Sequence, residues 1–231
     1  MDLGSYNSHY RILVAVDCII FGFNETHLKA LLIKRGFEPE KGKWSLMGGF
    51  VREDESIDQA AGRVLNQLTG MKSIYMEQLR AFGDVDRDSA GRVISIAYFA
   101  LINIADHSSE LQLEHEAKWF PLQEVPDLVF DHEKLLSKAK ERLREKVARD
   151  PIGFELLPPK FTLQRLQCLY EAIYEMPFDR RNFTRKMRSL GILNRLNEKE
   201  RTSSKKGAYY YEFNSHNYNS VDRNAMRFVD G

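Results

Sequence analysis

The sequence predicts an α+β protein of two domains, and three observations lead to this prediction. Strand-like and helix-like apolar patterns interleave along residues 1–150. A stretch at 151–160 holds three of the chain's 7 prolines and separates two parts of the sequence that differ in composition. Residues 151–231 hold 14 Lys and Arg against 9 Asp and Glu, whereas the preceding residues hold 20 against 24. We therefore expect a first domain at 1–150, a linker at 151–160 and a second domain at 161–231.

Composition excludes several classes of protein. With 43% hydrophobic and 29% charged residues, the chain is typical of a globular protein rather than a disordered one. Asp17 interrupts one long apolar run and Ser95 and Asn103 interrupt the other, so both fall short of the roughly 20 residues of a membrane helix. The first residues lack the pattern of a signal peptide, and two distant cysteines make no disulfide framework. We expect a cytoplasmic protein without a membrane partner.

The first domain begins with strands. Residues 11–23 and 28–34 are rich in β-branched and aromatic side chains and flank a turn, and 44–51 is a third strand-like segment with a glycine pair. A helix with one apolar face follows, capped by Asp54 or Ser56 and closed by Gly70. Further strands are predicted at 73–82, 92–104 and 117–122, and a charged helix at 131–149.

The second domain has two helices followed by a hairpin. A helix over 162–174 carries one apolar stripe, and a second helix is capped by Asp179 and stopped by Gly191. Strands at 192–196 and 208–213 enclose a polar and basic segment. Two helices followed by a basic hairpin are the pattern of a small winged helix-turn-helix domain.

The glycine-rich segment of the first domain carries a known motif. The span Gly49–Met71 resembles the Nudix box of the Nudix hydrolases, whose pattern is G-x5-E-x7-R-E-U-x-E-E-x-G-U with U apolar. The residues that fall at the expected positions are Gly49, Glu55, Arg63, Leu65, Gly70 and Met71. The resemblance implies the α/β/α sandwich of that family.

The same motif departs from the family at the positions that serve its metal. Val64, Gln67 and Leu68 stand where Nudix hydrolases have glutamates, at the i, i+3 and i+4 spacing that would gather three carboxylates around one Mg²⁺. Without that metal, little remains to stabilise the charge on a pyrophosphate or to activate water. The simplest explanation of Val64 and Leu68 is that they extend the apolar face of the helix onto a core or a subunit contact. We therefore expect no enzyme activity and no cofactor.

A scaffold that does not cleave a ligand can still bind one. An aromatic residue beside hydrogen-bonding side chains suits a nucleotide or a sugar. Surface charge is an equally good explanation for each charged candidate, and a place in the core for the tryptophan. The candidate effector-binding residues are Arg35, Lys43, Trp44, Asp84, Asp86, Arg87 and Arg92.

The second helix of the second domain has the layout of a DNA-reading helix. Phe183, Met187 and Leu190 form its apolar stripe, and arginines occupy a different face, where they can pair with guanine or clamp phosphates. A solvated charged face is the alternative, but 12 basic residues against 6 acidic ones over 160–213 favour DNA. The candidate DNA-binding residues are Arg180, Arg181, Asn182, Thr184, Arg185 and Arg188, with Lys205 and Lys206 in the wing.

Residues 8–213 as a whole resemble the Nudix-related transcriptional regulators. The resemblance implies an effector-binding Nudix domain and a winged helix that binds a double-stranded operator as a homodimer, usually as a repressor. Some members of that family respond to ADP-ribose and others to sugars such as arabinose. Met47 and the wing sequence KKGAYYYEF depart from the usual pattern. The missing glutamates remove the reason to keep a pyrophosphate ligand, so the sequence favours a sugar such as L-arabinose over ADP-ribose.

Two other functions remain open at this level. One is a Nudix hydrolase of nucleoside diphosphate derivatives whose unusual metal site is built from Glu53, Glu55, Asp84 or Asp86. The other is an interaction module whose basic helix contacts an acidic protein. Turnover of ADP-ribose would favour the first, and a lack of retention on duplex DNA at low salt would favour the second.

Overall fold

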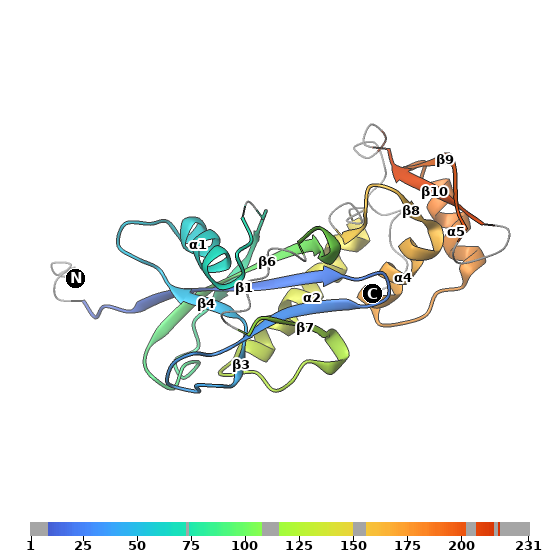
Figure 1. The fold of residues 1–231 in the computed structure, drawn as a ribbon. Coiled ribbons are helices and arrows are strands. Elements are labelled where there is room, and N and C mark those ends of the chain that lie inside the picture. Colours follow the sequence, from blue (N-terminus) through green and yellow to red (C-terminus); the bar gives the residue numbers. More distant parts are fainter. Residues whose placement is uncertain are drawn as a thin grey trace, which may run out of the picture.

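A mixed sheet and a small winged helix domain lie side by side in the computed structural model (Figure 1). The structure describes residues 9–72, 74–107, 116–149, 156–201, 207–214 and 217. The α+β architecture is confirmed. None of the helices in these ranges is long and apolar enough to cross a membrane.

Two long parallel strands form the centre of the seven-stranded sheet. β1 (Leu13–Phe23) pairs with β6 (Val93–Asn103) along their whole lengths. The path of the sheet is β3-β2-β1-β6-β5, while β4 pairs with β1 and β7 with β2. The other strands are β2 (Leu28–Lys34), β3 (Trp44–Ser45), β4 (Met47–Phe50), β5 (Glu77–Phe82) and β7 (Lys118–Pro121).

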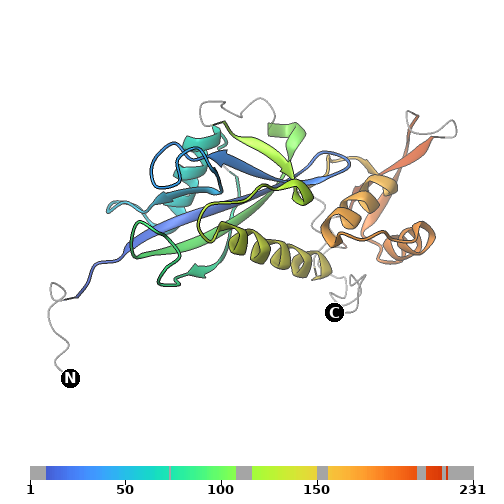
Figure 2. The ribbon, with the colours of Figure 1, turned by 90° about the horizontal axis from the view of Figure 1, so that it is seen from below.

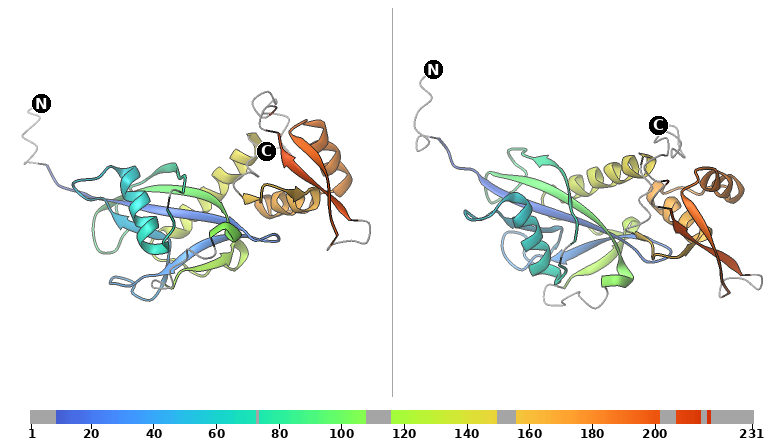
Figure 3. Two further views of the ribbon diagram at one scale, coloured as in Figure 1. Left: turned by 45° about the horizontal axis from the view of Figure 1, so that its top comes forward. Right: turned by 90° about the horizontal axis from the view of Figure 1, so that it is seen from above.

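Alternate side chains of β1 serve the two faces of the sheet. Cys18 and Ile20 pack with α1 (Ile57–Thr69), whereas Ile19 and Phe21 pack with α2 (His132–Arg149). Both faces are covered, which is why β1 is a nearly continuous apolar run rather than an alternating one. Figure 3 shows the two helices on opposite sides of the sheet.

Helix α1 has the ends that the sequence predicts. The Ser56 side chain accepts a hydrogen bond from the backbone N–H of Gln59, and the Gln59 side chain accepts one from the N–H of Ser56. Ser56, rather than Asp54, is therefore the N-cap, in a capping box. Gly70 ends the helix at φ 79°, a left-handed conformation that glycine adopts without strain.

The winged helix domain packs two helices on a three-stranded sheet. Leu166, Leu169 and Tyr170 of its first helix are buried, as are Phe183 and Met187 of its second. The strand order is β8-β10-β9. Its elements are β8 (Phe161–Thr162), α4 (Leu163–Tyr174), α5 (Arg180–Ser189), β9 (Leu193–Glu200) and β10 (Ala208–Phe213).

Several element boundaries differ from the predictions. β5 begins at Glu77 rather than at residue 73, and the segment predicted at 44–51 is divided into β3 and β4. β9 extends to Glu200, four residues beyond the apolar pattern, because pairing with β10 continues through polar positions. Leu190 caps α5 in a right-handed conformation, and Gly191 follows at φ 67°.

One apolar core passes from the sheet into the winged helix domain. It includes Phe21 and Phe23 of β1, Leu143 of α2 and Leu169 of α4. Leu156 lies at 0% exposure within the same core, in the segment predicted as a linker. Figure 2 shows α2 along the sheet, ending beside the winged helix domain.

Candidate functional site

The loop before α1 is held by a pair of charged side chains. Arg63 Nε and Nη2 donate to the two carboxylate oxygens of Glu55 at 2.8 and 2.5 Å. Nη2 also donates to the carbonyl of Phe50 at 2.9 Å. The bond from Arg63, helped by the Arg52 backbone N–H, lowers the pKa of Glu55 to about 2. Glu55 is thus an ionised carboxylate engaged in fixing the loop.

The three positions that departed from the Nudix pattern lie where the motif places them, and their side chains do not suit a divalent metal. Val64 is buried, and its Cγ2 would lie 2.8 Å from a Cβ added at Gly49. Gln67 accepts a hydrogen bond from Arg63 Nη1 at 3.2 Å, and Leu68 lines a cavity. In the described ranges, no three His, Cys, Asp or Glu side chains gather to hold a metal ion. This set of residues does not fit the Mg²⁺ site of Nudix hydrolases, whose ligands are hard oxygen atoms.

A cavity of about 290 Å³ opens beside Gly48 and Gly49 of β4, near the lower end of the sizes found for ligand pockets. Its walls come from β1, β2, β4 and the start of α2. Leu68 contributes an apolar patch, and Phe37, Phe50 and Phe130 contribute three aromatic rings. The cavity therefore combines apolar and aromatic walls with a polar floor.

A buried network of charged groups forms that floor. Arg87 Nη2 donates to Asp17 Oδ2 at 3.2 Å and to Asp131 Oδ1 at 2.8 Å, and Arg87 Nε donates to Asp131 Oδ2 at 3.1 Å. Ser95 Oγ donates to Asp17 Oδ2 at 2.6 Å. The Arg87 side chain is only 4% exposed, so the two carboxylates satisfy a charge that would otherwise be buried alone.

His132 completes the floor in its neutral form. The backbone N–H of Leu46 donates to His132 Nδ1 at 3.1 Å, so that nitrogen carries no proton. Burial lowers the pKa of His132, although Asp17 and Asp131 act in the opposite direction. The proton therefore resides on Nε2, which lies 3.6 Å from Asp17 Oδ1.

Gly48 is required at this site by close approach. A Cβ added to Gly48 would lie 2.3 Å from Asp17 Oδ1. Gly48 of β4 pairs with Asp17 of β1, and the backbone of β4 can lie directly on the Asp17 carboxylate only if residue 48 has no side chain.

Arg35 is one of the cations that line the cavity, together with Lys34 and Arg87. Its Nε donates to the carbonyl of Pro39 at 2.6 Å, and its guanidinium carbon lies 4.0 Å from the ring centroid of Phe37 and 5.1 Å from that of Phe130. Burial lowers the pKa of Arg35, while nearby acidic side chains oppose that shift. In the described part of the chain, no group accepts a hydrogen bond from its Nη atoms. Arg35 thus has two Nη atoms available to a ligand from a fixed position.

The other predicted effector residues are distributed around this cavity. Lys43 pairs with Glu40, and Lys43 and Trp44 line a neighbouring hollow. The Trp44 ring packs edge-on against Phe120, with centroids 4.7 Å apart. Asp84 and Asp86 line a third hollow with Arg87, and Arg92 Nη1 donates to the carbonyls of Gly83 and Asp84. Of the seven predicted residues, the main cavity brings together Arg35 and Arg87.

Sequence reasoning did not single out Phe37, Phe130 or His132 for this site, although all three line the cavity. Asp17 was noticed only as a break in an apolar strand. A carboxylate inside a buried strand requires a partner, and that was the signal available for Asp17. No local pattern marks the two phenylalanines.

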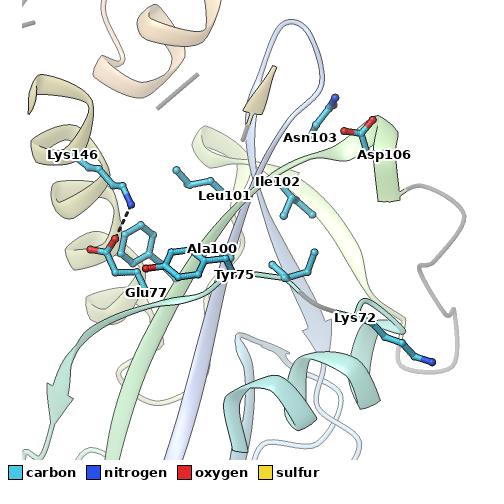
Figure 4. A pocket seen from close by; sticks show the side chains of 11 residues that line it. Lys72, Tyr75, Glu77, Ala100, Leu101, Ile102, Asn103, Asp106 and Lys146 are labelled. Carbon is cyan, nitrogen blue, oxygen red and sulfur yellow. Dashed lines mark hydrogen bonds and ion pairs between the residues drawn. The ribbon is translucent and has the colours of Figure 1, made fainter. Parts of the chain in front are cut away.

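A further hollow of about 330 Å³, separate from the three already described, lies at the C-terminal end of β6. Figure 4 shows Lys146 of α2 facing Glu77, and Asn103 of β6 beside Asp106 on the other side of the hollow. The Lys146 Nζ to Glu77 Oε2 distance is 2.7 Å. This hollow contains none of the predicted site residues.

Helix α5 presents its arginines to solvent. Phe183 and Met187 are buried, and Leu190 is partly buried, as the apolar stripe predicts. The exposed predicted DNA-binding residues are Arg180, Arg181, Asn182, Arg185 and Arg188, while Thr184 is partly buried. The Asp179 side chain accepts from the backbone N–H of Asn182 at 2.8 Å and caps the helix.

The arginines of α5 differ in how far they are held. Arg188 Nη2 donates to Tyr211 Oη at 3.0 Å, and Arg185 Nη2 donates to Asn182 Oδ1 at 2.9 Å. Arg180 and Arg181 have no hydrogen-bond or ion-pair partner among the described residues. The helix therefore offers two held and two unengaged guanidinium groups.

The wing contains a cationic cluster that the sequence analysis missed. The guanidinium carbon of Arg195 and Nζ of Lys199 lie 4.6 and 4.5 Å from the ring centroid of Tyr209. The pairing of β9 with β10 is irregular between these two residues, and their contact with the same ring places both cations on one side of the wing. The predicted wing residues Lys205 and Lys206 lie outside the described residues.

Comparison with known proteins finds two domain families in this chain. Residues 11–139 match the NUDIX domain and residues 153–213 match the NrtR DNA-binding winged helix domain. The chain is 34% identical to the ADPR responsive transcriptional repressor NtrR of Acinetobacter baylyi, over 89% of this chain and 84% of the relative. It is 38% identical to the ADP-ribose pyrophosphatase of Methanocaldococcus jannaschii, over 58% of this chain and 77% of the relative.

Solved structures show the same arrangement of domains. Shewanella oneidensis NrtR complexed with a 27mer DNA superposes with a TM-score of 0.75 at 30% identity, covering 89% of this chain and 95% of that one. The NUDIX domain of S. oneidensis NrtR complexed with ADP ribose superposes with a TM-score of 0.52 at 33% identity, covering 61% and 94%.

Proposed function

The chain belongs to the family of regulators that join a NUDIX domain to an NrtR DNA-binding winged helix domain, and from this premise we propose that it is an ADP-ribose-responsive transcriptional repressor. In this proposal the cavity beside Arg35 binds ADP-ribose and α5 binds the operator. A homodimer would present two recognition helices to a two-fold symmetric site. The architecture, a ligand-binding scaffold joined to a winged helix, is that of a ligand-responsive DNA-binding regulator.

The polar groups of the cavity support a diphosphate ligand. Arg35 is fixed through Nε and lines the cavity, and a guanidinium pairs well with phosphate oxygens. The rings of Phe37 and Phe130 beside it offer aromatic surface to a base. A free sugar has no diphosphate with which Arg35 could form charge-assisted hydrogen bonds. The expectation of L-arabinose as effector has no support among the relatives, two of which are named for ADP-ribose.

The side chains at the former metal positions support binding without cleavage. Val64 is buried, Leu68 lines the cavity, and Gln67 is engaged by Arg63. Glu55 is held by Arg63, and Asp84 pairs with Lys134, so these two carboxylates already have partners. We infer that ADP-ribose leaves the cavity intact and acts as a signal.

Operator binding in the presence of ADP-ribose tests this function directly. In fluorescence anisotropy with duplex DNA from the protein's own upstream region at fixed salt, ADP-ribose should weaken specific binding by about 5- to 150-fold. L-arabinose should leave the affinity unchanged, and ADP-ribose incubated with the protein and Mg²⁺ should be recovered uncleaved by chromatography. A response to L-arabinose alone, or steady release of AMP, would contradict the proposal.

Substitution of Arg35 tests the binding site. Arg35→Ala should weaken ADP-ribose binding in calorimetry by about 10- to 100-fold, because it removes charge-assisted hydrogen bonds to phosphate. Lys43→Ala is the matched control, since this substitution removes the same positive charge from the neighbouring hollow. Both variants should bind the operator as the wild type does without ligand. An equal loss of ADP-ribose affinity in Arg35→Ala and Lys43→Ala would contradict a specific contact between Arg35 and the diphosphate.

A further inference from the structure

Helix α2 contacts both the effector cavity and the helix-turn-helix. We propose that α2 transmits effector occupancy to the recognition helix, and that Glu175, held by Lys140 and Arg144, is the positioning residue at the receiving end. This inference rests on the proposed function, because it concerns how the cavity and the operator-binding helix are coupled.

The N-terminal end of α2 belongs to the floor of the cavity. Asp131 immediately precedes the helix, and both of its carboxylate oxygens accept hydrogen bonds from Arg87. The backbone carbonyl of Asp131 accepts from the N–H groups of Lys134 and Leu135 at 2.9 and 3.2 Å. His132, the first residue of α2, lines the cavity and is bonded to the N–H of Leu46. A ligand that shifts this floor therefore shifts the start of α2.

Helix α2 is suited to carry such a shift along its length. It has 18 residues, which corresponds to about 27 Å of α-helix. Its buried side chains Leu135, Ala139, Leu143 and Val147 recur at helical spacing and pack into the main core. A helix packed along one face moves as a unit rather than bending at one turn.

The distal half of α2 holds the turn of the helix-turn-helix. Lys140 Nζ lies 2.7 Å from Glu175 Oε1, and Arg144 Nη2 lies 2.5 Å from Glu175 Oε2. Arg144 Nε also donates to the carbonyl of Ile173 at 3.0 Å. Lys140 and Arg144 are one helical turn apart, so both lie on the same face of α2 and contact the C-terminal end of α4. Figure 2 shows this end of α2 beside the winged helix domain.

Glu175 is tightly joined to the start of α5. It caps α4 in a left-handed conformation at φ 56°, with its N–H bonded to the carbonyl of Glu171. The Glu171 carboxylate in turn accepts from the backbone N–H of Phe178 at 2.9 Å. The Phe178 ring stacks on Phe183 of α5, with centroids 6.0 Å apart. Movement of Glu175 is thus passed to α5 through the turn.

The ion pairs at Glu175 can be removed without unfolding the protein. The side chains of Glu175, Lys140 and Arg144 are 31%, 26% and 36% exposed, and partly exposed ion pairs contribute little to folding. Burial would raise the pKa of Glu175, but Lys140 and Arg144 outweigh that effect and lower it. The Glu175 carboxylate is therefore ionised when it makes these contacts.

Substitution of Glu175 or of Lys140 tests the inference. The quantity measured is the ratio of operator Kd values with and without ADP-ribose. In Glu175→Gln, and independently in Lys140→Ala, this ratio should fall from the wild-type value to less than about twofold. Each variant should still bind the operator without ligand, and its melting curve should show a folded protein. ADP-ribose binding to the DNA-free protein should stay within about threefold of wild type, since neither residue lies in the cavity.

Glu25→Gln provides the matched control. Glu25 Oε1 lies 3.2 Å from Arg165 Nη2 and joins the turn after β1 to α4, so this variant removes an interdomain ion pair that does not involve α2. It should keep the wild-type ratio. A wild-type ratio in both Glu175→Gln and Lys140→Ala, or an equal loss in Glu25→Gln, would overturn the assignment to α2 alone. A wild-type protein that does not respond to ADP-ribose would overturn the proposed function and this inference together.

Discussion

Operator binding should be lost when two arginines of α5 are replaced. We expect Arg181→Ala combined with Arg185→Ala to weaken binding to the operator duplex by at least about 30-fold, since a base or phosphate contact of arginine contributes about 1–3 kcal/mol. Arg181 is exposed and has no partner within the described ranges, and Arg185 contacts only Asn182 of the same helix. Neither side chain packs in the core, and alanine favours a helix, so the domain should remain folded.

A control for charge separates a specific contact from general attraction. Arg80→Ala combined with Lys118→Ala removes the same charge from exposed positions of the large sheet. That variant should retain operator affinity, and its salt dependence should match the wild type. The α5 variant should instead show a shallower slope of affinity against salt, by about two counterions. Unchanged affinity in the α5 variant would show that another surface binds DNA.

The second large effect concerns folding. We expect Arg87→Met to lower the free energy of unfolding by about 3–5 kcal/mol, because it leaves the carboxylates of Asp17 and Asp131 without their buried cation. Denaturant unfolding followed by circular dichroism would measure the change. The double variant Arg87→Met with Asp131→Leu should recover part of the lost free energy of unfolding. Two apolar side chains in contact cost less than a buried carboxylate without a partner.

Arg92→Met is the matched control for that measurement. Arg92 lies close to Arg87 in sequence, but it bonds the carbonyls of Gly83 and Asp84 near the surface. Its loss should cost about 1 kcal/mol or less. If Arg87→Met cost no more than Arg92→Met, the buried network would not hold the cavity floor together.

The sequence was informative where structure depends on neighbours along the chain. The Ser56 cap, the Gly70 stop and the apolar stripe of α5 follow from spacing within a few residues. The two-domain order was predicted from the Nudix motif and from the change in proline content and charge balance at residues 151–160. Strand β9 was predicted too short because its last residues, up to Glu200, are held by pairing with β10 rather than by apolar side chains.

The cavity could be predicted only in part, because its residues meet through tertiary contacts. Asp17 and Arg87 are 70 residues apart in the chain, and only the packing of loops on the sheet brings them together. Phe37 and Phe130 stand in segments without periodicity, so no pattern marked them as neighbours of Arg35. Lys43 and Trp44 stand near Gly48 and Gly49 in sequence but line a neighbouring hollow.

The continuous core has a consequence for how such regulators diversify. Since Leu143 of α2, the buried Leu156 and Leu169 of α4 share one apolar interior with β1, the DNA-reading part is not an interchangeable module. A winged helix grafted from a distant homologue would meet a mismatched surface at α2 and leave a void or a clash. New operator specificities should therefore arise by substitution on the exposed face of α5, whereas recombination at residues 151–160 should be rare unless the α2 surface is inherited with it.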